Sequence, residues 1–417
     1  MTLEVTRRID QIRHGIVPEG YKKTKAGIVP AEWTEYAIAD CLKRVERPVE
    51  VKSDEMYTQI GIRSHGKGLF YKEPVNGTSL GNKSVFWIEP NCFVLNIVFA
   101  WEQAIGKTTQ KEVGMIGSHR FPMYRPINER VDIDYLISYL MTKRGKDILE
   151  AASPGGAGRN RTLGQDRFMN SKIVLPTLTE QKKIASILTM QDKIIELEQQ
   201  KIEEIKKAKR FYFEKMFPKK GQAVPEIRFK GFTAPWEQRK LGDVVQITMG
   251  QSPDGSTYSD EPSDYILLQG NADLQNGWVC PRIWTTQITK KADAGDLIMS
   301  VRAPAGAMGK TAYNAVIGRG VAAIKGNEFI YQMLVKMDMD GFWKTLSCGS
   351  TFESLNSDNI KNAEVKVPTT AEQVQIGDFF RQLDTLIILH QRKLEEEKRK
   401  KKALVQLLLT GLVRVNA

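Results

Sequence analysis

The amino-acid sequence repeats itself, and this internal repeat limits the fold more than any other feature. The motifs recur in the same order: a Trp-led segment at Ala31-Glu32-Trp33 and Ala234-Pro235-Trp236, a Gly-Lys-Thr at Gly106-Lys107-Thr108 and Gly309-Lys310-Thr311, and a Pro-Thr-x-x-Glu-Gln ending at Gln181 and Gln373. The first two pairs lie 203 positions apart and the third lies 192 apart, so the halves differ by a net 11 residues between these signals. A repeated order of motifs is typical of a chain built from two copies of one unit.

Each half begins with a globular segment that has the pattern of an α+β domain. Short β-forming runs are broken by Gly, Pro and Asn and predict strands, at Ser84–Ile88, Phe93–Phe99, Tyr265–Leu268 and Asp296–Val301. Apolar residues at spacings of three and four predict helix near Ile133–Glu150, with a counterpart near Glu328–Leu346. The fold class we expect is therefore α+β, with two pseudo-repeated α/β domains, each followed by a long helix.

The two long helices, which follow Pro176 and Pro368, carry apolar residues every seven positions. The predicted seam consists of Ile184, Leu188, Ile195 and Ile202 in the first helix and of Ile376, Phe380, Ile387 and Leu394 in the second. His390 also falls on this seam and is expected to be structural. A heptad seam predicts packing against another helix of the same kind. About 38 residues rising 1.5 Å each form a rod of about 57 Å.

A surface helix packed on its own domain is the alternative interpretation of each long helix. The polar faces are dense in charge, as at Glu203-Glu204 and Glu395–Lys400, which suits the solvated sides of a protruding pair. Two equivalent helices in one chain can bury each other's apolar seams. We therefore expect an antiparallel coiled coil, with the globular domains related by a pseudo-two-fold axis.

Charge and composition favour a polyanionic partner and a soluble chain. Lys and Arg number 61 against 49 Asp and Glu, a net charge of +12, and a basic surplus favours nucleic acid because bound cations release its counterions. The four cysteines form no C-x-x-C pair, which fits a reducing cytoplasm. The sequence has no apolar run near 18 residues and no secretory h-region at its N-terminus. We expect a cytoplasmic chain that does not enter a membrane.

Catalytic motifs are missing from the sequence. The only histidines are His14, His65, His119 and His390, and none has metal-site spacing. Neither Gly-Lys-Thr is a P-loop, because Trp101 and Pro304 occupy the position that requires the first glycine. The Asn/Asp-Pro-Pro-Tyr/Phe segment of adenine methyltransferases and the G-x-G-x-x-G fingerprint are absent. We predict no catalytic residues, no metal site and no cofactor on this chain.

Several motifs together resemble one known family. They are Gly20–Thr24 leading to Trp33, Ile227–Phe232 leading to Trp236, Met249–Pro253, Gly349-Ser350-Thr351 leading to Leu355, and the twin Pro-Thr-x-x-Glu-Gln helix starts. In this order the chain resembles the specificity subunits of type I restriction-modification systems over almost its whole length. In the first half, Gly158–Thr162 replaces the Gly-Ser-Thr signal and still aligns with Leu163.

The resemblance implies a domain plan and a set of partners. The plan is an N-terminal extension at 1–28, target recognition domains at 29–175 and 229–367, helical spacers at 176–217 and 368–417, and a linker at 218–228. The family would bind an asymmetric, split site in double-stranded DNA. Its partners would be two methyltransferase subunits, which use S-adenosylmethionine, and motor-nuclease subunits, which use ATP and Mg²⁺.

The candidate DNA-binding residues are basic and polar side chains in Gly-rich loops. Base edges are recognised by Arg, Lys, Asn and Gln, and phosphates by basic or hydroxyl side chains. The candidates are Arg63, Ser64, His65, Lys67, Lys107, Arg120, Arg159 and Arg161 in the first domain, and Gln251, Ser252, Arg302, Lys310, Arg319 and Ser350 in the second. Each could equally be an exposed loop residue without a role.

Two other functions remain open at this point. A DNA-binding scaffold or transcription regulator without a modification partner would share the charge and the coiled coil, although regulators more often dimerise through identical chains. An enzyme whose active site lacks a recognisable motif is the other. A neighbouring methyltransferase gene would favour the specificity subunit, whereas activity of the isolated chain on DNA and S-adenosylmethionine would favour the enzyme.

Overall fold

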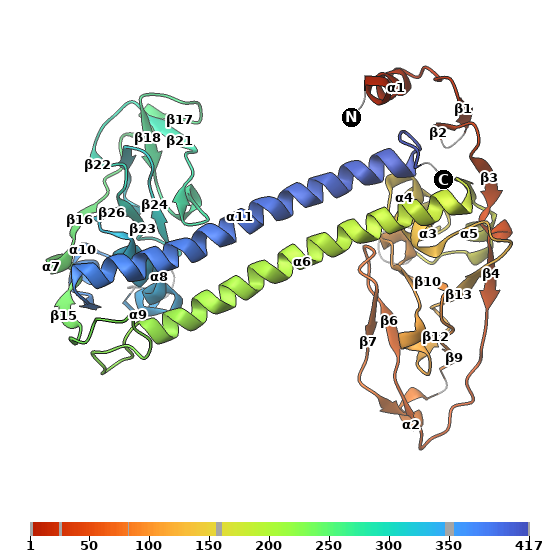
Figure 1. The fold of residues 1–417 in the computed structure, drawn as a ribbon, viewed down its shortest axis with the longest axis horizontal. Coiled ribbons are helices and arrows are strands. Elements are labelled where there is room, and N and C mark those ends of the chain that lie inside the picture. Colours follow the sequence, from red (N-terminus) through yellow and green to blue (C-terminus); the bar gives the residue numbers. More distant parts are fainter. Residues whose placement is uncertain (1–2, 25–26, 82, 156–160, 347–353, 416–417) are drawn as a thin grey trace. The chain divides into compact units, whose positions relative to one another are not determined.

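The computed structural model of the chain describes residues 3–24, 27–81, 83–155, 161–346 and 354–415. It divides into two compact units, unit 1 with residues 1–197 and 395–417, and unit 2 with residues 198–394. Each unit therefore contains one predicted recognition domain and parts of both long helices, α6 (Leu178–Met216) and α11 (Thr370–Leu409) (Figure 1).

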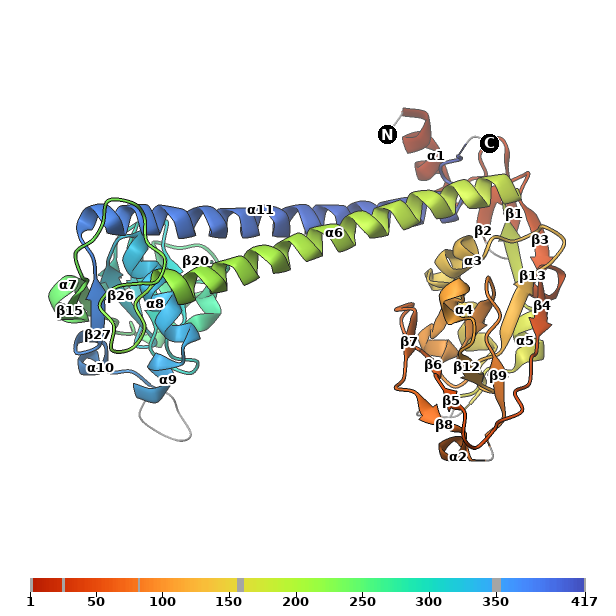
Figure 2. The same ribbon diagram turned by 60° about the horizontal axis from the view of Figure 1, so that its bottom comes forward.

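Unit 1 is built on a four-stranded antiparallel sheet in the order β11-β10-β13-β4. Its described elements are α1 (Leu3–Arg13), β1 (Tyr21–Thr24), β2 (Gly27–Pro30), β3 (Thr34–Ala37), η1 (Ile38–Asp40), β4 (Leu42–Val45), β5 (Met56–Tyr57), β6 (Ile60–Ile62), β7 (Leu69–Tyr71), β8 (Val75–Asn76), α2 (Gly77–Leu80), β9 (Val85–Trp87), β10 (Phe93–Leu95), η2 (Ala100–Glu102), β11 (Ile105–Lys107), η3 (Gln110–Glu112), β12 (Ile116–Ser118), β13 (Met123–Pro126), α3 (Ile133–Leu140), α4 (Lys143–Ala151), α5 (Gln165–Asn170) and β14 (Lys172–Leu175). Helices α3 and α4 lie beside these strands (Figure 2).

Unit 2 repeats this sheet and extends it. The order β24-β23-β26-β16 matches that of unit 1, and β20 and β19 continue the sheet beyond β24. Its described elements are β15 (Glu237–Lys240), α7 (Leu241–Val244), β16 (Gln246–Met249), η4 (Gly255–Thr257), β17 (Tyr258–Ser259), β18 (Tyr265–Leu268), η5 (Asn271–Asp273), β19 (Leu274–Gln275), β20 (Trp278–Val279), β21 (Ile283–Thr285), β22 (Lys290–Ala292), β23 (Leu297–Ser300), β24 (Met308–Lys310), β25 (Ala315–Ile317), β26 (Val321–Lys325), α8 (Glu328–Met339), α9 (Phe342–Leu346), α10 (Ser357–Lys361) and β27 (Glu364–Val367). The predicted α+β class and the duplication are confirmed.

The strand that precedes each long helix pairs with the strand that follows the tryptophan motif of the same half. In unit 1 β14 pairs with β3, and in unit 2 β27 pairs with β15, both antiparallel. These ribbons fix the direction in which α6 and α11 begin. The predicted strand runs each contain a strand, whereas each predicted domain helix is two helices. The break before α4 is capped by Thr142, and Gly341, at φ 75°, separates α8 from α9.

Each unit buries the first turns of one long helix and the last turns of the other. The core of unit 1 includes Ile184 and Leu188 of α6 with Leu408 of α11, and that of unit 2 includes Phe380 of α11 with Phe213 of α6. Contacts within each unit run in opposite directions along the two helices. In unit 1, Gln191 donates to the Glu397 carboxylate at 2.5 Å, and in unit 2 Lys209 contacts Asp384 at 2.5 Å. The predicted antiparallel pairing is therefore present in both units.

Candidate nucleic-acid interface

Strand register brings several candidate residues of unit 2 to one edge of its sheet. The end of β16 lies beside the start of β26, where Met249 pairs with Ala322, and the end of β23 lies there too, where Ser300 pairs with Val321. The loops that leave this edge carry the exposed Gln251, Arg302 and Arg319. The Arg319 amide donates to the Ser252 hydroxyl at 3.1 Å, which joins two of the loops. We call these residues, Gln251, Ser252, Arg302 and Arg319, the loop edge of unit 2.

Glycines allow the loops of this edge to approach one another. A Cβ on Gly250 would lie 2.1 Å from the carbonyl oxygen of Gly318, and one on Gly320 would lie 1.9 Å from that of Gln269. Real side chains cannot occupy these distances without moving the backbone. The Gly in Met249–Pro253 and the Gly-Arg-Gly around Arg319 are therefore explained by close backbone packing, which sets where the polar side chains emerge.

Unit 1 has the corresponding edge, with different side chains. The Ile97 amide donates to the Arg120 carbonyl at 3.0 Å and the Leu163 amide to the Ile97 carbonyl at 2.8 Å. In unit 2, the Val301 amide donates to the Gly320 carbonyl and the Leu355 amide donates to the Val301 carbonyl, both at 2.9 Å. Leu163 and Leu355 are thus equivalent, as the sequence predicted. Arg120 is exposed here, and the Arg161 guanidinium lies over the Trp101 ring, 5.4 Å from its centroid.

The hairpin between β6 and β7 joins the same edge of unit 1. The His65 amide donates to the Glu102 carbonyl at 2.8 Å and the Ser64 hydroxyl to the Glu102 carboxylate at 2.8 Å. Lys67 is exposed at the tip of the hairpin, and the Arg63 guanidinium donates a hydrogen bond to the Leu69 carbonyl at 3.1 Å. We call the set of Arg63, Ser64, His65, Lys67, Trp101, Glu102, Arg120 and Arg161 the loop edge of unit 1.

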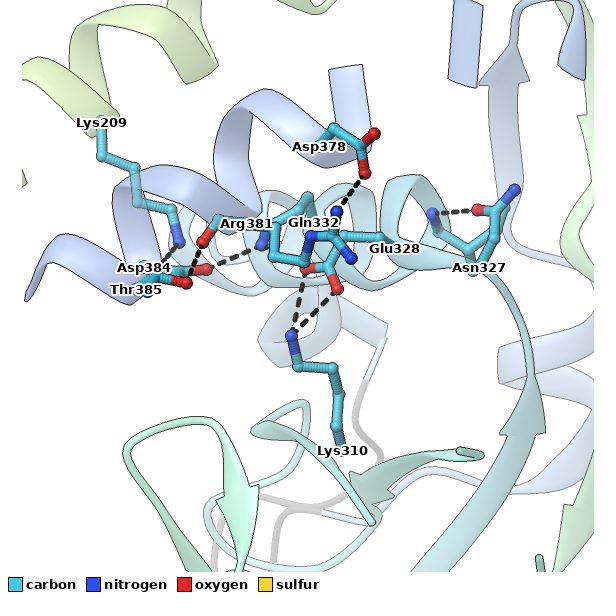
Figure 3. A network of polar contacts seen from close by, with 10 residues as sticks. Lys209, Lys310, Asn327, Glu328, Gln332, Asp378, Arg381, Asp384 and Thr385 are labelled. Atoms are coloured by element: carbon cyan, nitrogen blue, oxygen red, sulfur yellow. Dashed lines mark hydrogen bonds and ion pairs between the residues drawn. The ribbon is translucent and has the colours of Figure 1, made fainter. Parts of the chain in front are cut away.

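The two Gly-Lys-Thr lysines lie at the opposite ends of their strands. Lys107 pairs with Phe93 at the start of β10, and Lys310 pairs with Leu297 at the start of β23, so both are away from the loop edges. Lys107 contacts Asp134 in the first turn of α3 at 2.7 Å, and Lys310 contacts Glu328 in the first turn of α8 at 3.0 Å (Figure 3). This geometry gives both lysines a structural explanation that does not need DNA.

In unit 2 the contact of Lys310 with Glu328 continues into a polar network, centred on Gln332, that reaches both long helices. The Gln332 amide donates to Glu328 at 2.8 Å and to Asp384 of α11 at 2.7 Å, and Asp384 contacts Lys209 of α6 (Figure 3). Gln332 is fully buried. Lys209 lies seven residues after the seam residue Ile202, and it contributes an ion pair to the seam rather than apolar packing.

The Glu-Gln of each long-helix start forms two anchors. In unit 1, the Gln181 side chain accepts a hydrogen bond from the Asp132 amide at 2.9 Å and donates one to the Pro176 carbonyl at 3.0 Å. In unit 2, the Gln373 side chain donates to the Pro368 carbonyl at 3.0 Å and accepts from the Asn327 side chain at 2.9 Å. The glutamine thus fastens the helix start to the cap of α3 in unit 1 and of α8 in unit 2.

The glutamate of the same motif binds an arginine from beyond the end of the other long helix. The Glu372 carboxylate accepts hydrogen bonds from Nε and Nη2 of Arg228, both at 2.7 Å. The Glu180 carboxylate accepts hydrogen bonds from Nε and Nη2 of Arg414 at 2.7 and 2.9 Å. The carboxylates raise the pKa of both guanidinium groups. These arginine–glutamate clamps escaped the sequence analysis, although Ile227-Arg228-Phe229 and Val413-Arg414-Val415 share an apolar-Arg-apolar pattern.

Within the seam, a buried carboxylate is held by a histidine and a lysine. Glu198 is 3% exposed and contacts His390 at 2.7 Å and Lys393 at 2.8 Å in unit 2. These two groups lower the pKa of Glu198 to about 2. The predicted seam residues Ile184, Leu188, Ile202, Ile376 and Phe380 are buried, and Ile195, Ile387 and Leu394 are half-buried.

The loop edges offer hydrogen-bond donors from arginine side chains. The guanidinium groups of Arg120, Arg161, Arg302 and Arg319 make no hydrogen bond or ion pair with any other residue that the structure describes, and planar arginine donors suit phosphates and guanine edges.

Arg159 and Ser350 lie outside the described residues. The described ranges contain no group of three or more His, Cys, Asp or Glu placed to hold a metal ion, and every helix in them is too short or too polar to cross a membrane.

Comparisons with known proteins agree on one kind of protein. A family model described as the type I restriction modification DNA specificity domain matches residues 82–207 and 234–398. A putative type I restriction enzyme MjaX specificity subunit from Methanocaldococcus jannaschii is 27% identical over 420 residues, which cover 95% of this chain and 97% of that protein.

Two solved structures share the fold. A chain from a study of complex assembly and conformational transition of the type I R-M system has a TM-score of 0.56 at 21% identity, covering 92% of this chain and 99% of that one. The type I restriction-modification S subunit from M. genitalium has a TM-score of 0.53 at 14% identity, covering 92% and 97%.

Proposed function

The chain belongs to the type I restriction modification DNA specificity family, and from this premise we propose that each unit recognises one half of a split DNA site through its loop edge. As a specificity subunit, the chain is the DNA sequence-recognition component of its system. The observation that carries the proposal is one repeated backbone frame with different side chains on equivalent loops. Unlike edges bind unlike base sequences, so the site is asymmetric.

Charge and donor geometry support double-stranded DNA as the ligand. The chain carries a net charge of +12, and arginines without an internal partner occupy both loop edges. Arg recognises guanine O6 and N7 in the major groove through two parallel hydrogen bonds, and basic side chains bind phosphates without sequence preference. The regulator considered from the sequence is not favoured, because the family is one of specificity subunits.

The long helices supply the surface that we assign to partner subunits. Leu197 of α6 and Leu389 of α11 hold equivalent positions and are 45% and 53% exposed, outside the buried seam. Met190 extends the exposed apolar row of α6 in unit 1, and Leu386 extends that of α11 in unit 2. Exposed apolar rows on a helix favour packing against another helix. We assign them to two methyltransferase subunits, with motor-nuclease subunits joining the assembly.

The chemistry of the system then belongs to those subunits. The methyltransferases would bind S-adenosylmethionine and methylate adenine, and the motor-nuclease subunits would use ATP and Mg²⁺. This chain would bind none of these and would contribute no catalytic residue.

A methylation map of a host genome tests the proposal. The chain is co-expressed with its methyltransferase in a methylation-free host, and N6-methyladenine is located by sequencing. One asymmetric split motif, methylated on both strands and absent without the chain, is the expected result. Leu197→Asp with Leu389→Asp should abolish co-purification and methylation. An assembled, active complex that methylates no such motif would refute the proposal.

A further inference from the structure

The η2 turn of unit 1 places an aromatic ring beneath one of the candidate DNA-binding arginines. Building on the proposed function, we propose that Trp101 is a positioning residue that holds Arg161 for recognition of a guanine in the half-site of unit 1. In the sequence, Trp101 stands out only because it occupies the position where a P-loop would require a glycine. The structure places it on the loop edge.

The Trp101 ring is itself fixed. Its indole N–H donates to the Val98 carbonyl at 3.1 Å, and the turn that carries it ends at Gln103, which is left-handed at φ 57°. The buried Gln103 side chain donates to the Leu140 carbonyl at the end of α3 at 2.8 Å. The indole therefore has a defined position relative to the helix and the sheet of unit 1.

Arg161 uses this ring as a support and keeps its donors available. The centre of its guanidinium lies 5.4 Å from the Trp101 ring centroid. A cation over an indole face is attracted by the ring quadrupole, and the in-plane N–H groups remain unused. No other described residue accepts a hydrogen bond from this guanidinium. A supported, planar set of free donors matches the O6 and N7 acceptors of guanine.

The same turn also holds the hairpin of the loop edge. Glu102, the neighbour of Trp101, binds the Ser64 hydroxyl through its carboxylate and the His65 amide through its carbonyl. The Gly66 amide donates to the Gln103 carbonyl at 2.9 Å. Three consecutive residues thus organise Arg161 and the Arg63–Gly68 loop on one surface, so that a shift of η2 would move both.

In the part of unit 2 that the structure describes, no arginine of the loop edge lies over an aromatic ring. The residue at the matching motif position is Pro304, which lacks an aromatic face, and the arginines of that edge, Arg302 and Arg319, come from other loops. The inferred guanine contact therefore belongs to the first half-site alone, and the second half-site serves as an internal control in every experiment.

The test compares four variants of the assembled methyltransferase complex on DNA with each base of the motif substituted. Arg161→Ala and Trp101→Ala should each lower discrimination for one guanine of the first half-site by about 5- to 150-fold, the range of one bidentate contact. Trp101→Phe should restore most of it, because a phenyl ring still supports a guanidinium. Arg130→Ala removes a similar stack, over Tyr36 at 5.0 Å, at the other end of β13, and should change no base preference.

The outcomes separate the inference from its premise. Unchanged guanine discrimination in Trp101→Ala, or equal relaxation of both half-sites, would overturn the positioning role. Loss in Trp101→Phe as severe as in Trp101→Ala would also count against it, because support by an aromatic face would then not be what matters. A wild-type complex without a split motif would overturn the proposed function itself, and the inference with it.

Discussion

The two units share what connects them to the long helices and differ in what they present at their loop edges. Both have the same four-strand order, a glutamine fastened at the start of a long helix and an arginine–glutamate clamp. Unit 1 then carries the β6–β7 hairpin and the Trp101 support, whereas unit 2 carries a five-stranded sheet of β17, β21, β18, β25 and β22. Duplication thus preserved the frame and left the loops different.

This difference separates residues that hold the fold from residues that meet the ligand. Lys107 and Lys310 occupy equivalent positions in both units and contact an acid within the unit. The sequence does not repeat Arg161 or Arg302 in its other half, and no described residue forms a hydrogen bond or an ion pair with their guanidinium groups. A basic residue that the repeat retains belongs to the frame, and one that the repeat does not retain is the better candidate for specificity.

The clamps should give the largest effect and should differ between the units. Arg228→Ala leaves the fully buried Glu372 carboxylate without its cation, and we expect a loss of about 3–5 kcal/mol in unfolding free energy. Arg414 is 30% exposed, so water replaces it more easily, and Arg414→Ala should cost about 1–3 kcal/mol. Hydrogen exchange at the starts of α11 and α6 measures each effect separately. Equal losses would show that burial does not distinguish the clamps.

The charged layer of the seam should produce a pH-dependent effect. Glu198 has a pKa of about 2 in the folded chain against 4.5 ordinarily, lowered by Lys393, His390 and Lys201. A lowered pKa means that its stabilisation is complete above pH 4.5 and is lost as the pH falls toward 2. Glu198→Gln should therefore cost about 1–3 kcal/mol near pH 7, and its difference from wild type should vanish near pH 2.

Glu203→Gln is the matched control for this layer. Glu203 lies on the same helix, is 62% exposed and pairs with Lys206 one turn away. Its loss should change unfolding free energy by less than about 0.5 kcal/mol at any pH. Chemical denaturation between pH 2 and 7 compares the two variants, and parallel curves would contradict the role assigned to Glu198.

Each loop edge should control its own half-site. Arg302→Ala should lower discrimination in the half-site of unit 2 by about 1–3 kcal/mol per lost base contact, and Arg120→Ala should affect only that of unit 1. Methylation rates on substituted DNA measure both. A variant in one unit that relaxes the other unit's half-site would break the division of labour between the edges.

The Gly-Lys-Thr lysines should give the smallest effect on recognition. Lys107→Met and Lys310→Met remove frame ion pairs, so base preference at both half-sites should remain that of the wild type. The salt dependence of DNA binding should also keep its slope, because no phosphate contact is lost. A slope lower by about one, measured by titration at several salt concentrations, would return these lysines to the interface.

Sequence reasoning was strongest where the two halves could be compared. The repeat predicted the duplicated fold, the long helices and the equivalence of Leu163 with Leu355, because each signal was present twice. It could not separate Lys107 from Arg120, since that distinction depends on which end of a strand each residue occupies. The ion pairs of Arg228 and Arg414 were missed because their partners lie more than a hundred residues away, and periodicity carries no information on such contacts.

Site-specific cross-linking to DNA tests the central claim most directly. A photoreactive side chain is placed in turn at Arg120 and Arg319 on the loop edges and at Lys107 and Lys310 on the frame, and the cross-linked bases of the bound site are mapped. We expect Arg120 to mark one half-site, Arg319 the other, and the lysine positions neither. Cross-links from the lysine positions, or from both arginines to the same half-site, would contradict the assignment of one half-site to each loop edge.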